Sequence, residues 1–556
     1  KKEDKLINLR VSKSSIDVPV QLRQFHMDEL LPPMEVPPPS ISSTDPTFVD
    51  EEWLSGSVQS VISHYESEDE DVLRVRPTAF IRCSRGGKTR ALKEMARRLK
   101  SSLHASVIFV SFHDFTPIDE WEATDHIAAL CRRIAFAARR NRSETYFANF
   151  SNADVKPQHI VEWLGNNPRI LLIDELNVLE YYPVESKISS RFAFYLKKNF
   201  LMQKNQYFVF SSHYVSAAGT LATYLDISSP RLVSIIELPL IRKVCDAREI
   251  FNWPEMNLRH ALFYGLVPAL IYLARLENNG EKYLPFSKRD NGIDDCIKKG
   301  IVTNKSVRNL FSSFITGNKH SVLEPLHELM NTAENEKLRW IPFHMTEVLR
   351  RFASSNDVFP PLEPSLQHAM LKINKLFEEF YDTNENSGEA WEKLFLIGVI
   401  VRVLSGQFDK VILPLDSSKD YSISFNKELT SIVDVDEFVG RFTKPDRYPH
   451  IEIGQPKHAA FAHYDLIILV HESKKKRKLY AYQLKEGSKI PDDPVDKAKT
   501  KFEACVLMRG QSQGLSRSTK NWIIPSTSQI KEFFGESGKH WTPEEWRKLM
   551  SSPPPS

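Results

Sequence analysis

The sequence predicts an α/β protein with two separate sheets, and three observations lead to that fold class. Short apolar segments alternate with helical patterns between residues 73 and 240, which is typical of a doubly wound parallel sheet. Helical periodicity replaces the strand pattern from about 241 to 365. A second group of apolar strands follows the proline-containing boundary at 356–365, so we expect a second α/β domain there.

The first sheet is expected from five apolar runs that have the length of buried strands. These runs are LRVRPTAFI at 73–81, SVIFVSF at 106–112, RILLID at 169–174, YFVFSS at 207–212 and VSIIEL at 233–238. The intervening helices are predicted at 88–101, 119–141 and 188–203. Ligands of such sheets bind outside the carboxyl ends of the strands, so we expect the functional residues at that edge.

The turn after the first strand carries a phosphate-binding pattern within AFIRCSRGGKTRAL. Gly86 and Gly87 allow backbone amides to approach phosphate oxygens, and a helix follows at once. Lys88 would reach the β- and γ-phosphates, while the Thr89 hydroxyl would bind Mg²⁺. The usual spacing of a P-loop also has glycine six residues before the lysine, where this chain has Arg82.

Other residues of this region are predicted to complete an ATP and Mg²⁺ site. The strand RILLID ends in Asp174, which would hold Mg²⁺ through water, and the next residue, Glu175, would polarise the attacking water. Ser212 and His213 end the next strand, where they could sense a γ-phosphate. The remaining predicted nucleotide contacts are Arg85 and Arg90. The alternative for an isolated GGKT is a glycine-rich surface turn, but three strands in this order favour nucleotide binding.

Composition sets broad limits on function. A net charge of +3 in 556 residues is too small to indicate a nucleic-acid partner, so any basic surface must be local. The five cysteines are scattered without CxxC spacing, which supports neither a disulfide framework nor a zinc site. No apolar run reaches the ~20 residues that a membrane-spanning helix needs. The chain starts with KKEDK instead of Met, so we expect a fragment whose leader is absent.

The predicted domain organisation has four parts. Residues 1–50 are expected to be a linker, because LPPMEVPPPS at 31–40 favours extended, poorly packed backbone. The P-loop domain is predicted at 51–240, a helical lid at 241–365 and the second α/β domain at 366–556. The arginines between 132 and 142 are expected to form a solvated helix face, and Cys83 is expected to be a plain small loop residue.

The second domain contains a pattern of residues suited to phosphodiester cleavage. Glu392 lies on a helix predicted at 387–404, Asp465 opens a strand at 464–470, and Gln483 and Lys485 end a strand at 478–487. Cleavage requires a hard cation held by oxygen ligands and a nearby positive charge. Glu392, Asp465 and the Gln483 carbonyl would bind the metal, and Lys485 would offset the developing charge. The alternative is that these are structural surface charges.

This order of residues resembles the restriction-endonuclease-like nucleases, in which Asp is followed by (Asp/Glu)-x-Lys; here Gln483 takes the place of the acid. We also expect a strand near 410–413, a helix at 495–508, the strand NWIIPS and the helix IKEFF. The run KKKRK at 474–478 should form an exposed loop that is solvated, grips phosphate or serves as a nuclear-import signal. The basic stretch at 509–520 could add to the same nucleic-acid footprint.

Taken together, the segments IRCSRGGKTRALKE, LCRRIAFAAR, LLIDELN, YFVFSSH and YDLIILV with YQLK resemble the Crinkler effectors of filamentous plant pathogens. The resemblance covers about 75–556 and implies a P-loop NTPase joined to a nuclease-like domain. It also implies secretion by the pathogen, delivery to the host nucleus with the help of host import machinery, and action on nucleic acid, DNA more than RNA. The two functional hypotheses are therefore an ATP-driven switch that controls a Mg²⁺-dependent nuclease, and an inactive nuclease that binds DNA and perturbs transcription.

Overall fold

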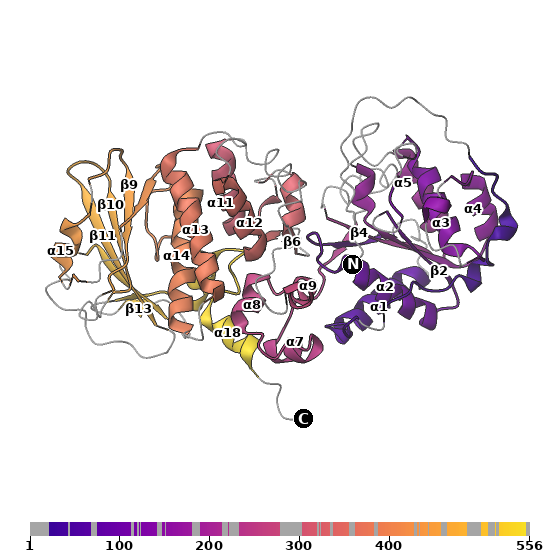
Figure 1. Ribbon diagram of the computed structural model, residues 1–556, viewed down its shortest axis with the longest axis horizontal. Helices are drawn as coiled ribbons and strands as arrows, with labels where there is room; N and C mark the ends of the chain where they lie inside the picture. The colour runs from indigo at the N-terminus through magenta and orange to yellow at the C-terminus, as the bar shows by residue number, and fades with distance from the viewer. Residues whose placement is uncertain are drawn as a thin grey trace.

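The computed structural model describes residues 22–42, 45–67, 75–112, 116–118, 122, 124–141, 147–150, 152–180, 190–213, 221, 233–278, 303–319, 322, 324–333, 337–354, 362–382, 387–426, 431–432, 434–442, 444–457, 464–485, 502–509, 517–518 and 522–551. The chain forms an α/β layer at one end, a second sheet at the other end and helices between them (Figure 1).

The first sheet is fully parallel, as the alternation of strands and helices predicts. Its strands lie in the order β2-β3-β4-β1-β5, so β4 separates the phosphate-loop strand β1 from the acidic strand β3. The bounds are β1 Thr78–Ile81, β2 Ser106–Ser111, β3 Arg169–Asp174, β4 Gln206–Ser212 and β5 Ser234–Ile236. This order places the carboxyl ends of β1, β3 and β4 side by side, at the edge where ligands bind.

Helices cover both faces of this sheet, because each helix has one apolar side. The helices α1 (Glu51–Glu66) and α2 (Lys88–Ser102) lie on one face, and α3 (His126–Ala138), α4 (Pro157–Leu164) and α5 (Ser190–Phe200) lie on the other (Figure 1). Leu92, Met95 and Leu99 follow helical spacing on α2 and are buried against the sheet. The core thus fixes the start of α2, and with it the phosphate loop.

The proline-rich N-terminal segment packs against the first domain, so the expectation of a poorly packed linker was wrong for the described part. Val36 and Pro33 are buried. The carbonyl of Pro33 accepts a hydrogen bond from Ser106 Oγ at 2.7 Å, and that of Leu31 accepts one from Trp163 Nε1 at 2.8 Å. Proline has no backbone N–H that would need a hydrogen-bond partner. A proline-rich segment can therefore pack on a folded surface through its rings and carbonyl groups, without pairing as a strand.

The arginine cluster on α3 also differs from expectation. Arg132 and Arg133 are buried and pair with the buried carboxylate of Glu122, at 2.5 Å and 3.1 Å respectively. Arg133 further donates to the carbonyls of Thr116 and Ala129. The carboxylate that compensates these charges lies in a separate loop, which helical periodicity alone does not reveal.

The middle region is mainly helical. Its elements are α7 (Val244–Ile250), α8 (Leu258–Phe263), α9 (Pro268–Asn278), α11 (Asn304–Thr316), the short 3₁₀ helix η8 (Glu324–Leu329) and α12 (Pro342–Ser354). The sequence did not predict the hairpin of β6 (Met330–Thr332) and β7 (Leu338–Trp340). Trp340 is held by contacts with distant residues, since its indole donates to Ser313 Oγ and its backbone N–H donates to Ser537 Oγ. Such tertiary contacts override local propensity.

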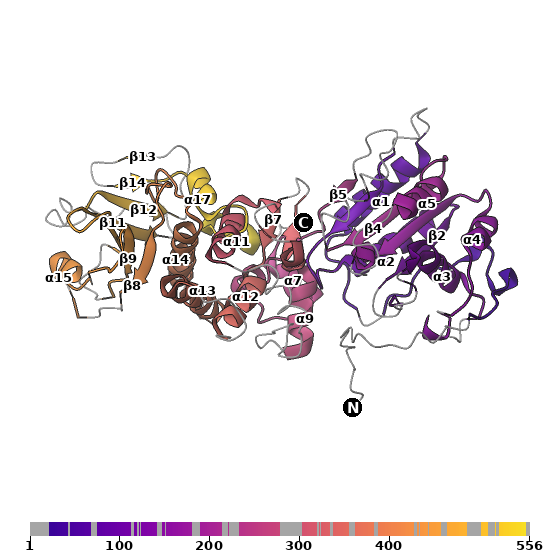
Figure 2. The ribbon, with the colours of Figure 1, turned by 90° about the horizontal axis from the view of Figure 1, so that it is seen from above.

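The second sheet is mixed and has seven strands in the order β13-β14-β12-β11-β10-β9-β8. Its elements are α13 (Pro364–Asp382), α14 (Ser387–Ser405), β8 (Ser422–Phe425), α15 (Val435–Gly440), β9 (His450–Gly454), β10 (Leu466–His471), β11 (Arg477–Lys485), β12 (Ala504–Arg509), β13 (Arg517–Ser518), β14 (Ile523–Ile524), α17 (Thr527–Phe534) and α18 (Pro543–Met550). Figure 2 shows α13 and α14 between this sheet and the other middle helices.

Two expectations for this domain were wrong. Residues 410–413 form bends instead of a strand, because the Asp409 carboxylate accepts the N–H groups of Val411 and Ile412 and so closes a turn. Residues 504–508 belong to the strand β12 instead of a helix, and β12 pairs in parallel with β11. Residues 502–503 are not helical either, and 495–501 lie outside the described residues.

The C-terminal helices return to the middle of the molecule. Helix α18 packs on α7 and α8, and Trp541 contacts the rings of Phe314 and Phe377. In the described part of the chain, no helix has the length and apolar character required to cross a membrane. The four described cysteines are all free thiols, in keeping with their scattered positions.

Candidate functional site

The phosphate loop connects β1 to α2 with the geometry that an anion-binding turn requires. Gly87, with φ +90°, caps α2 in a left-handed conformation that glycine adopts without strain. A Cβ at Gly86 would lie 2.5 Å from Arg82 Cγ, so only glycine fits there. The turn therefore needs glycine at both predicted positions, and the first turn of α2 presents its free N–H groups beside it.

Arg82 replaces the first glycine of the usual spacing, and its side chain is part of the loop structure. The buried guanidinium donates to the carbonyls of Leu238 and, at 3.1 Å, Pro239, in the segment after β5. Burial lowers the pKa of Arg82 to about 10, so the group stays charged at neutral pH. Arg82 thus ties the phosphate loop to the segment that follows β5, the edge strand next to β1.

Lys88 lies at the centre of the site and is fully hydrogen-bonded. Its Nζ donates to the carbonyls of Arg82 (3.2 Å) and Cys83 (3.0 Å) and to His213 Nδ1 (2.9 Å). Burial lowers the pKa of Lys88, while the nearby carboxylates of Glu175 and Asp174 oppose this effect. The loop carbonyls thus hold the buried Lys88 ammonium in a position where it would neutralise the charge of a bound phosphate.

His213 connects Lys88 with Glu175. Its Nε2 lies 3.1 Å from Glu175 Oε1, on the opposite side of the ring from the bond to Lys88. A neutral imidazole with its proton on Nε2 satisfies both contacts, since it accepts from the ammonium and donates to the carboxylate. The Asn177 side chain accepts the backbone N–H of His213 at 3.1 Å and fixes its position.

The Asp174 carboxylate is hydrogen-bonded to hydroxyl groups from three elements, α2, β2 and β4. It accepts hydrogen bonds from Thr89 at 2.8 Å, from Ser211 at 2.7 Å and from Ser111 at 3.3 Å. Burial and the neighbouring Glu175 raise the pKa of Asp174, and the hydroxyl groups and Lys88 partly offset that rise. A divalent cation bound at this cluster of hard oxygens would stabilise the buried carboxylate.

Glu175 is held in an unusual backbone conformation. Its φ is +58°, which is rare for a residue other than glycine, and its N–H donates to Ser211 Oγ at 2.9 Å. Conformations of this kind cost of the order of 1 kcal/mol and persist where the surroundings fix them. Here the strained turn directs Glu175 toward His213 instead of along β3.

The other predicted contacts are distributed around the loop. Ser212 is buried, and its carbonyl accepts the N–H of Arg82 at 3.3 Å. Arg90 pairs with Asp45 at 3.0 Å and Glu94 at 2.7 Å. Arg85 lies on the side of the middle region; burial lowers the pKa of His344 to about 4, and the charge of Arg85 adds to that effect. Burial raises the pKa of Cys83 to about 11, which keeps the thiol protonated and unreactive.

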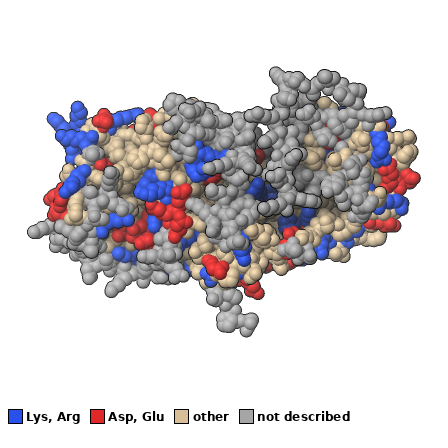
Figure 3. All heavy atoms as spheres, viewed as in Figure 1, with Lys and Arg blue, Asp and Glu red and all other residues tan. Residues whose placement is uncertain are grey.

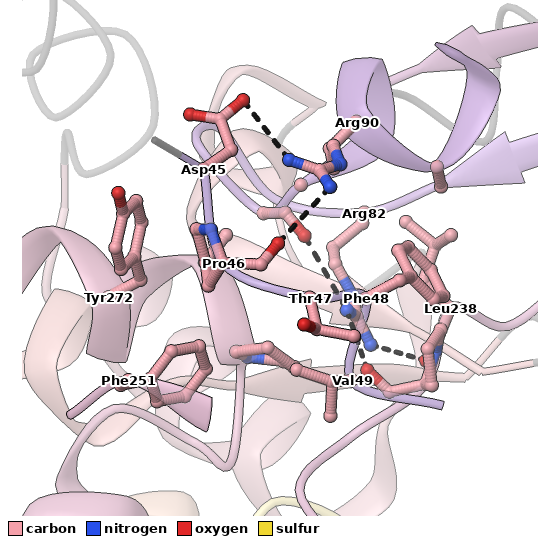
Figure 4. A pocket seen from close by; sticks show the side chains of 16 residues that line it. Asp45, Pro46, Thr47, Phe48, Val49, Arg82, Arg90, Leu238, Phe251 and Tyr272 are labelled. Carbon is pink, nitrogen blue, oxygen red and sulfur yellow. Dashed lines mark hydrogen bonds and ion pairs between the residues drawn. The ribbon is translucent and has the colours of Figure 1, made fainter. Parts of the chain in front are cut away.

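A cavity of about 190 Å³ opens next to the loop, and most of its lining was not predicted from the sequence. Figure 4 shows Phe48, Phe251 and Tyr272 around it, with Arg82 and Arg90 at the side of the loop. These aromatic residues come from the N-terminal segment, α9 and the turn after α7. No local motif connects three such distant segments, so only the fold could reveal them.

The residues suit Mg²⁺, which usually takes one or two protein oxygens together with phosphate oxygens and water. Thr89 and Asp174 supply those oxygens in adjacent positions. No three His, Cys, Asp or Glu side chains gather into a metal-binding group anywhere in the described ranges. A cation at this site would therefore depend on the nucleotide for its remaining ligands.

The second domain brings Asp465, Glu392 and Lys485 near one another. The regular ladder of β10 and β11 ends at Leu466, and the Asp465 carboxylate then accepts the N–H of Leu484 at 2.6 Å. Burial, and next the charge of Asp465, raise the pKa of Glu392 to about 7, although Lys457 and Lys485 partly oppose this rise. A pair of nearby carboxylates with two lysines is thus present at the open end of the hairpin.

Gln483 lies two residues before Lys485 on β11, so their side chains share one face of the strand. It is buried on β11 on the same side as Ala481, facing the smaller apolar cluster that includes Ile467 and Leu507. Tyr482, on the opposite side, packs against Phe395 of α14, the helix that carries Glu392. Gln483 and Lys485 therefore share the sheet face opposite to Tyr482, at the end of the hairpin that Glu392 reaches from α14.

The basic run at 474–478 forms the closed end of the same hairpin, where the side chains of 474–477 are exposed. Figure 3 shows Lys and Arg gathered at this corner of the molecule. Asp465 and Lys485 lie at the other end of the strands, roughly 20 Å away at 3.3 Å per residue. The loop is therefore separate from the carboxylate pair. Of the basic stretch at 509–520, only 509 and 517–518 are described.

Comparisons with known proteins add little to this geometry. No family model matches the chain, and no curated protein matches it. A structure of the replication initiator DnaA bound to AMPPCP and single-stranded DNA is similar over 65% of this chain and 96% of its own, at 12% identity and a TM-score of 0.27. AMPPCP-bound DnaA from Aquifex aeolicus covers 60% of this chain and 96% of its own, at 13% identity and a TM-score of 0.28.

A Cdc6p structure from Pyrobaculum aerophilum gives similar values, with 12% identity, 64% of this chain, 97% of its own and a TM-score of 0.28. Similarities at such low scores indicate nothing about the function of this chain.

Proposed function

We propose that this chain is a P-loop ATPase whose nucleotide site lies at the carboxyl edge of the first sheet. One observation carries the proposal: Thr89, at the start of α2, is hydrogen-bonded to Asp174 at the end of β3, next to Lys88 and Glu175. A glycine-rich surface turn would not need a buried lysine or a buried carboxylate. A site for Mg²⁺ and a polyphosphate uses the lysine to neutralise the phosphates and the carboxylate to hold the cation.

Each residue has a role that follows from its position. The amides of the loop and of the first turn of α2 bind phosphate oxygens, and Lys88 neutralises their charge. Thr89 and Asp174 hold Mg²⁺, which when bound would offset charge on the phosphates. Glu175 orients a water molecule, and His213 holds Glu175 in place. The aromatic cavity beside the loop has the apolar lining that suits a purine base.

Steady-state phosphate release tests the proposal. The parent should hydrolyse ATP in the presence of Mg²⁺. Glu175→Gln should reduce turnover at least about a hundredfold while nucleotide binding persists, since general-base groups contribute roughly 10²–10⁴ in rate. Glu162→Gln, a substitution on the exposed part of α4, is the matched control and should leave the rate unchanged. Equal rates for the parent and Glu175→Gln would remove Glu175 from the mechanism.

A second function, a metal-dependent nuclease, is favoured by the carboxylate pair of Glu392 and Asp465. Burial and then the charge of Asp465 raise the pKa of Glu392, so a divalent cation between the two carboxylates would stabilise their ionised forms, and Lys485 supplies the nearby positive charge. The proposed substrate is nucleic acid, DNA in preference to RNA. In this account the ATPase acts as a switch for the nuclease. The alternative is that the domain binds DNA without cutting it and perturbs transcription.

Incubation of plasmid DNA with the chain and Mg²⁺ separates the two alternatives. If the domain is a nuclease, the parent cuts and Asp465→Asn and Lys485→Ala do not, although both still bind DNA. If it is only a binding domain, the parent binds without cutting. Asp436→Asn, on the exposed helix α15, serves as the control for charge.

The resemblance to Crinkler effectors supports a further proposal about location. We propose that the protein is a secreted pathogen effector that enters the host nucleus, with the exposed loop at 474–478 as the signal for host import machinery. Replacing Lys474 and Lys475 by Ala in a fluorescent fusion should then shift the protein to the host cytoplasm. Unchanged nuclear accumulation would assign import to another segment.

A further inference from the structure

A segment from the middle region contacts the phosphate loop directly. The backbone N–H of Ser84 donates a hydrogen bond of 2.7 Å to the carbonyl oxygen of Glu328. Glu328 belongs to η8, which precedes β6. The Glu328 carboxylate also lies close enough to Lys88 to favour the charged form of the lysine. Glu328 of the middle region therefore interacts with two groups of the phosphate loop, the Ser84 amide and the Lys88 ammonium.

The Glu328 carbonyl occupies an amide of the phosphate loop, and the Glu328 carboxylate adds negative charge near Lys88. Lys88 already interacts with Asp174 and Glu175 through their charges, so Glu328 is a third carboxylate around one ammonium. Asp174 and Glu175 belong to the sheet edge, whereas Glu328 reaches the loop from outside the sheet. An additional phosphate next to Lys88 would meet the charge of Glu328 at close range in a partly buried place.

We propose that Glu328 is a specificity-determining residue that competes with the γ-phosphate of a nucleoside triphosphate for the mouth of the phosphate loop. The inference rests on the nucleotide binding proposed above. A triphosphate must displace the Glu328 carboxylate before Lys88 can bind its γ-phosphate. A diphosphate ends one phosphate earlier and leaves the contact in place. The site thereby distinguishes the two nucleotides by charge.

The same contact gives the nucleotide a route to the second domain. The carbonyl of Leu329, the next residue, is hydrogen-bonded to His344 Nδ1 of α12 at 2.9 Å. Helix α12 packs on α13, and α13 packs on α14, which carries Glu392. Displacement of η8 by a triphosphate is therefore transmitted through packed helices to one member of the carboxylate pair.

Calorimetry with two ligands tests the competition on the full chain. The ligands are a non-hydrolysable ATP analogue and ADP, each with Mg²⁺, and the proteins are the parent, Glu328→Gln and Glu249→Gln. Glu249 lies exposed on α7 in the same region and is the control. Removing one close charge should raise affinity for the triphosphate by about tenfold and change ADP affinity by less than about twofold. An equal change for both ligands, or no change for either, would overturn the inference.

Hydrogen exchange gives a second readout that does not depend on a substitution. Amides of 324–333 should exchange faster with the triphosphate analogue than with ADP, because only the triphosphate displaces η8. Equal exchange rates of these amides with the two ligands would contradict the inference, even if Glu328→Gln changes the affinities for the two ligands differently. Failure of the proposed function has another signature, since the parent would then bind neither ligand.

Discussion

At the scale of single residues, the site depends on buried charges that compensate one another. Lys88 and Asp174 are both almost fully buried, and each is stabilised by hydrogen bonds and by the opposite charge. An unpaired buried charge would cost several kcal/mol, so neither residue is expected in a domain that has no use for it. Arg82 follows the same rule, because its buried guanidinium is hydrogen-bonded to the carbonyls of Leu238 and Pro239.

The raised pKa of Glu392 predicts how stability depends on pH. Its pKa is about 7 in the folded chain and 4.5 when exposed, so between these values the folded state holds a proton that the unfolded state releases. Stability should therefore fall as pH rises from about 4.5 through 7. Relative to Glu392→Gln, the parent should lose roughly 1–3 kcal/mol over this range, after discounting for its partial exposure.

Urea unfolding of the parent and of Glu392→Gln at pH 5 and pH 8 measures how the difference between their free energies of unfolding changes with pH. Mg²⁺ should reduce it, because the cation favours the ionised carboxylate. A difference in stability that is the same at both pH values would show that Glu392 titrates normally.

At the scale of secondary-structure elements, helices from the middle region complete the nucleotide cavity. Helix α9 begins with Pro268 and reaches the loop at Ala269, whose Cβ lies 3.2 Å from the position of a Cβ on Gly87. One turn further along, Tyr272 lines the cavity opposite Phe48. The helix is thus placed to close over a bound base.

Tyr272→Ala should weaken ATP binding by roughly tenfold, because base stacking on an aromatic side chain contributes of the order of 1–3 kcal/mol. Leu276→Ala is the matched control, since Leu276 lies on the same helix and is exposed. Competition of a fluorescent ATP analogue measures both variants. Equal affinities for the two variants would place the base elsewhere.

Local patterns predicted many of these elements and missed others for identifiable reasons. The strands of the first sheet are continuous apolar runs, and the residues at their ends are fixed by the chain direction, so Asp174 and Ser212 could be placed at one edge from the sequence. The carboxylate of Glu122 and the rings of Phe48 and Phe251 reach their sites only through long-range packing. β12 was mistaken for helix because it is buried on both faces, which removes the alternation that marks a strand.

At the scale of the whole molecule, Arg339 links three parts of the chain. Its guanidinium pairs with Glu237, which follows β5 of the first sheet, and at 2.6 Å with Glu536, which follows α17. Arg339 itself lies on β7 of the middle region. All three side chains are largely buried, so this cluster holds the first domain and the C-terminal segment against the same hairpin.

Arg339→Ala should lower the free energy of unfolding by about 2–4 kcal/mol, because it removes the closest cation from two partly buried carboxylates, although Glu536 keeps longer pairs with Lys337 and Lys539. Arg308→Ala removes an exposed pair with Asp420 and should cost less than about 1 kcal/mol. Thermal unfolding followed by circular dichroism compares the two. Equal thermal unfolding midpoints for Arg339→Ala and Arg308→Ala would mean that the domains are held together by apolar contacts alone.

Calorimetric titration of the intact chain and of Lys88→Ala with Mg²⁺ and ATP decides whether the phosphate loop binds a nucleotide. The account predicts saturable binding with one site per chain for the parent. It predicts a loss of at least about a hundredfold in affinity for the variant, since charge-assisted contacts to phosphate are lost together. Absence of binding by the parent, or equal binding by both proteins, would contradict it.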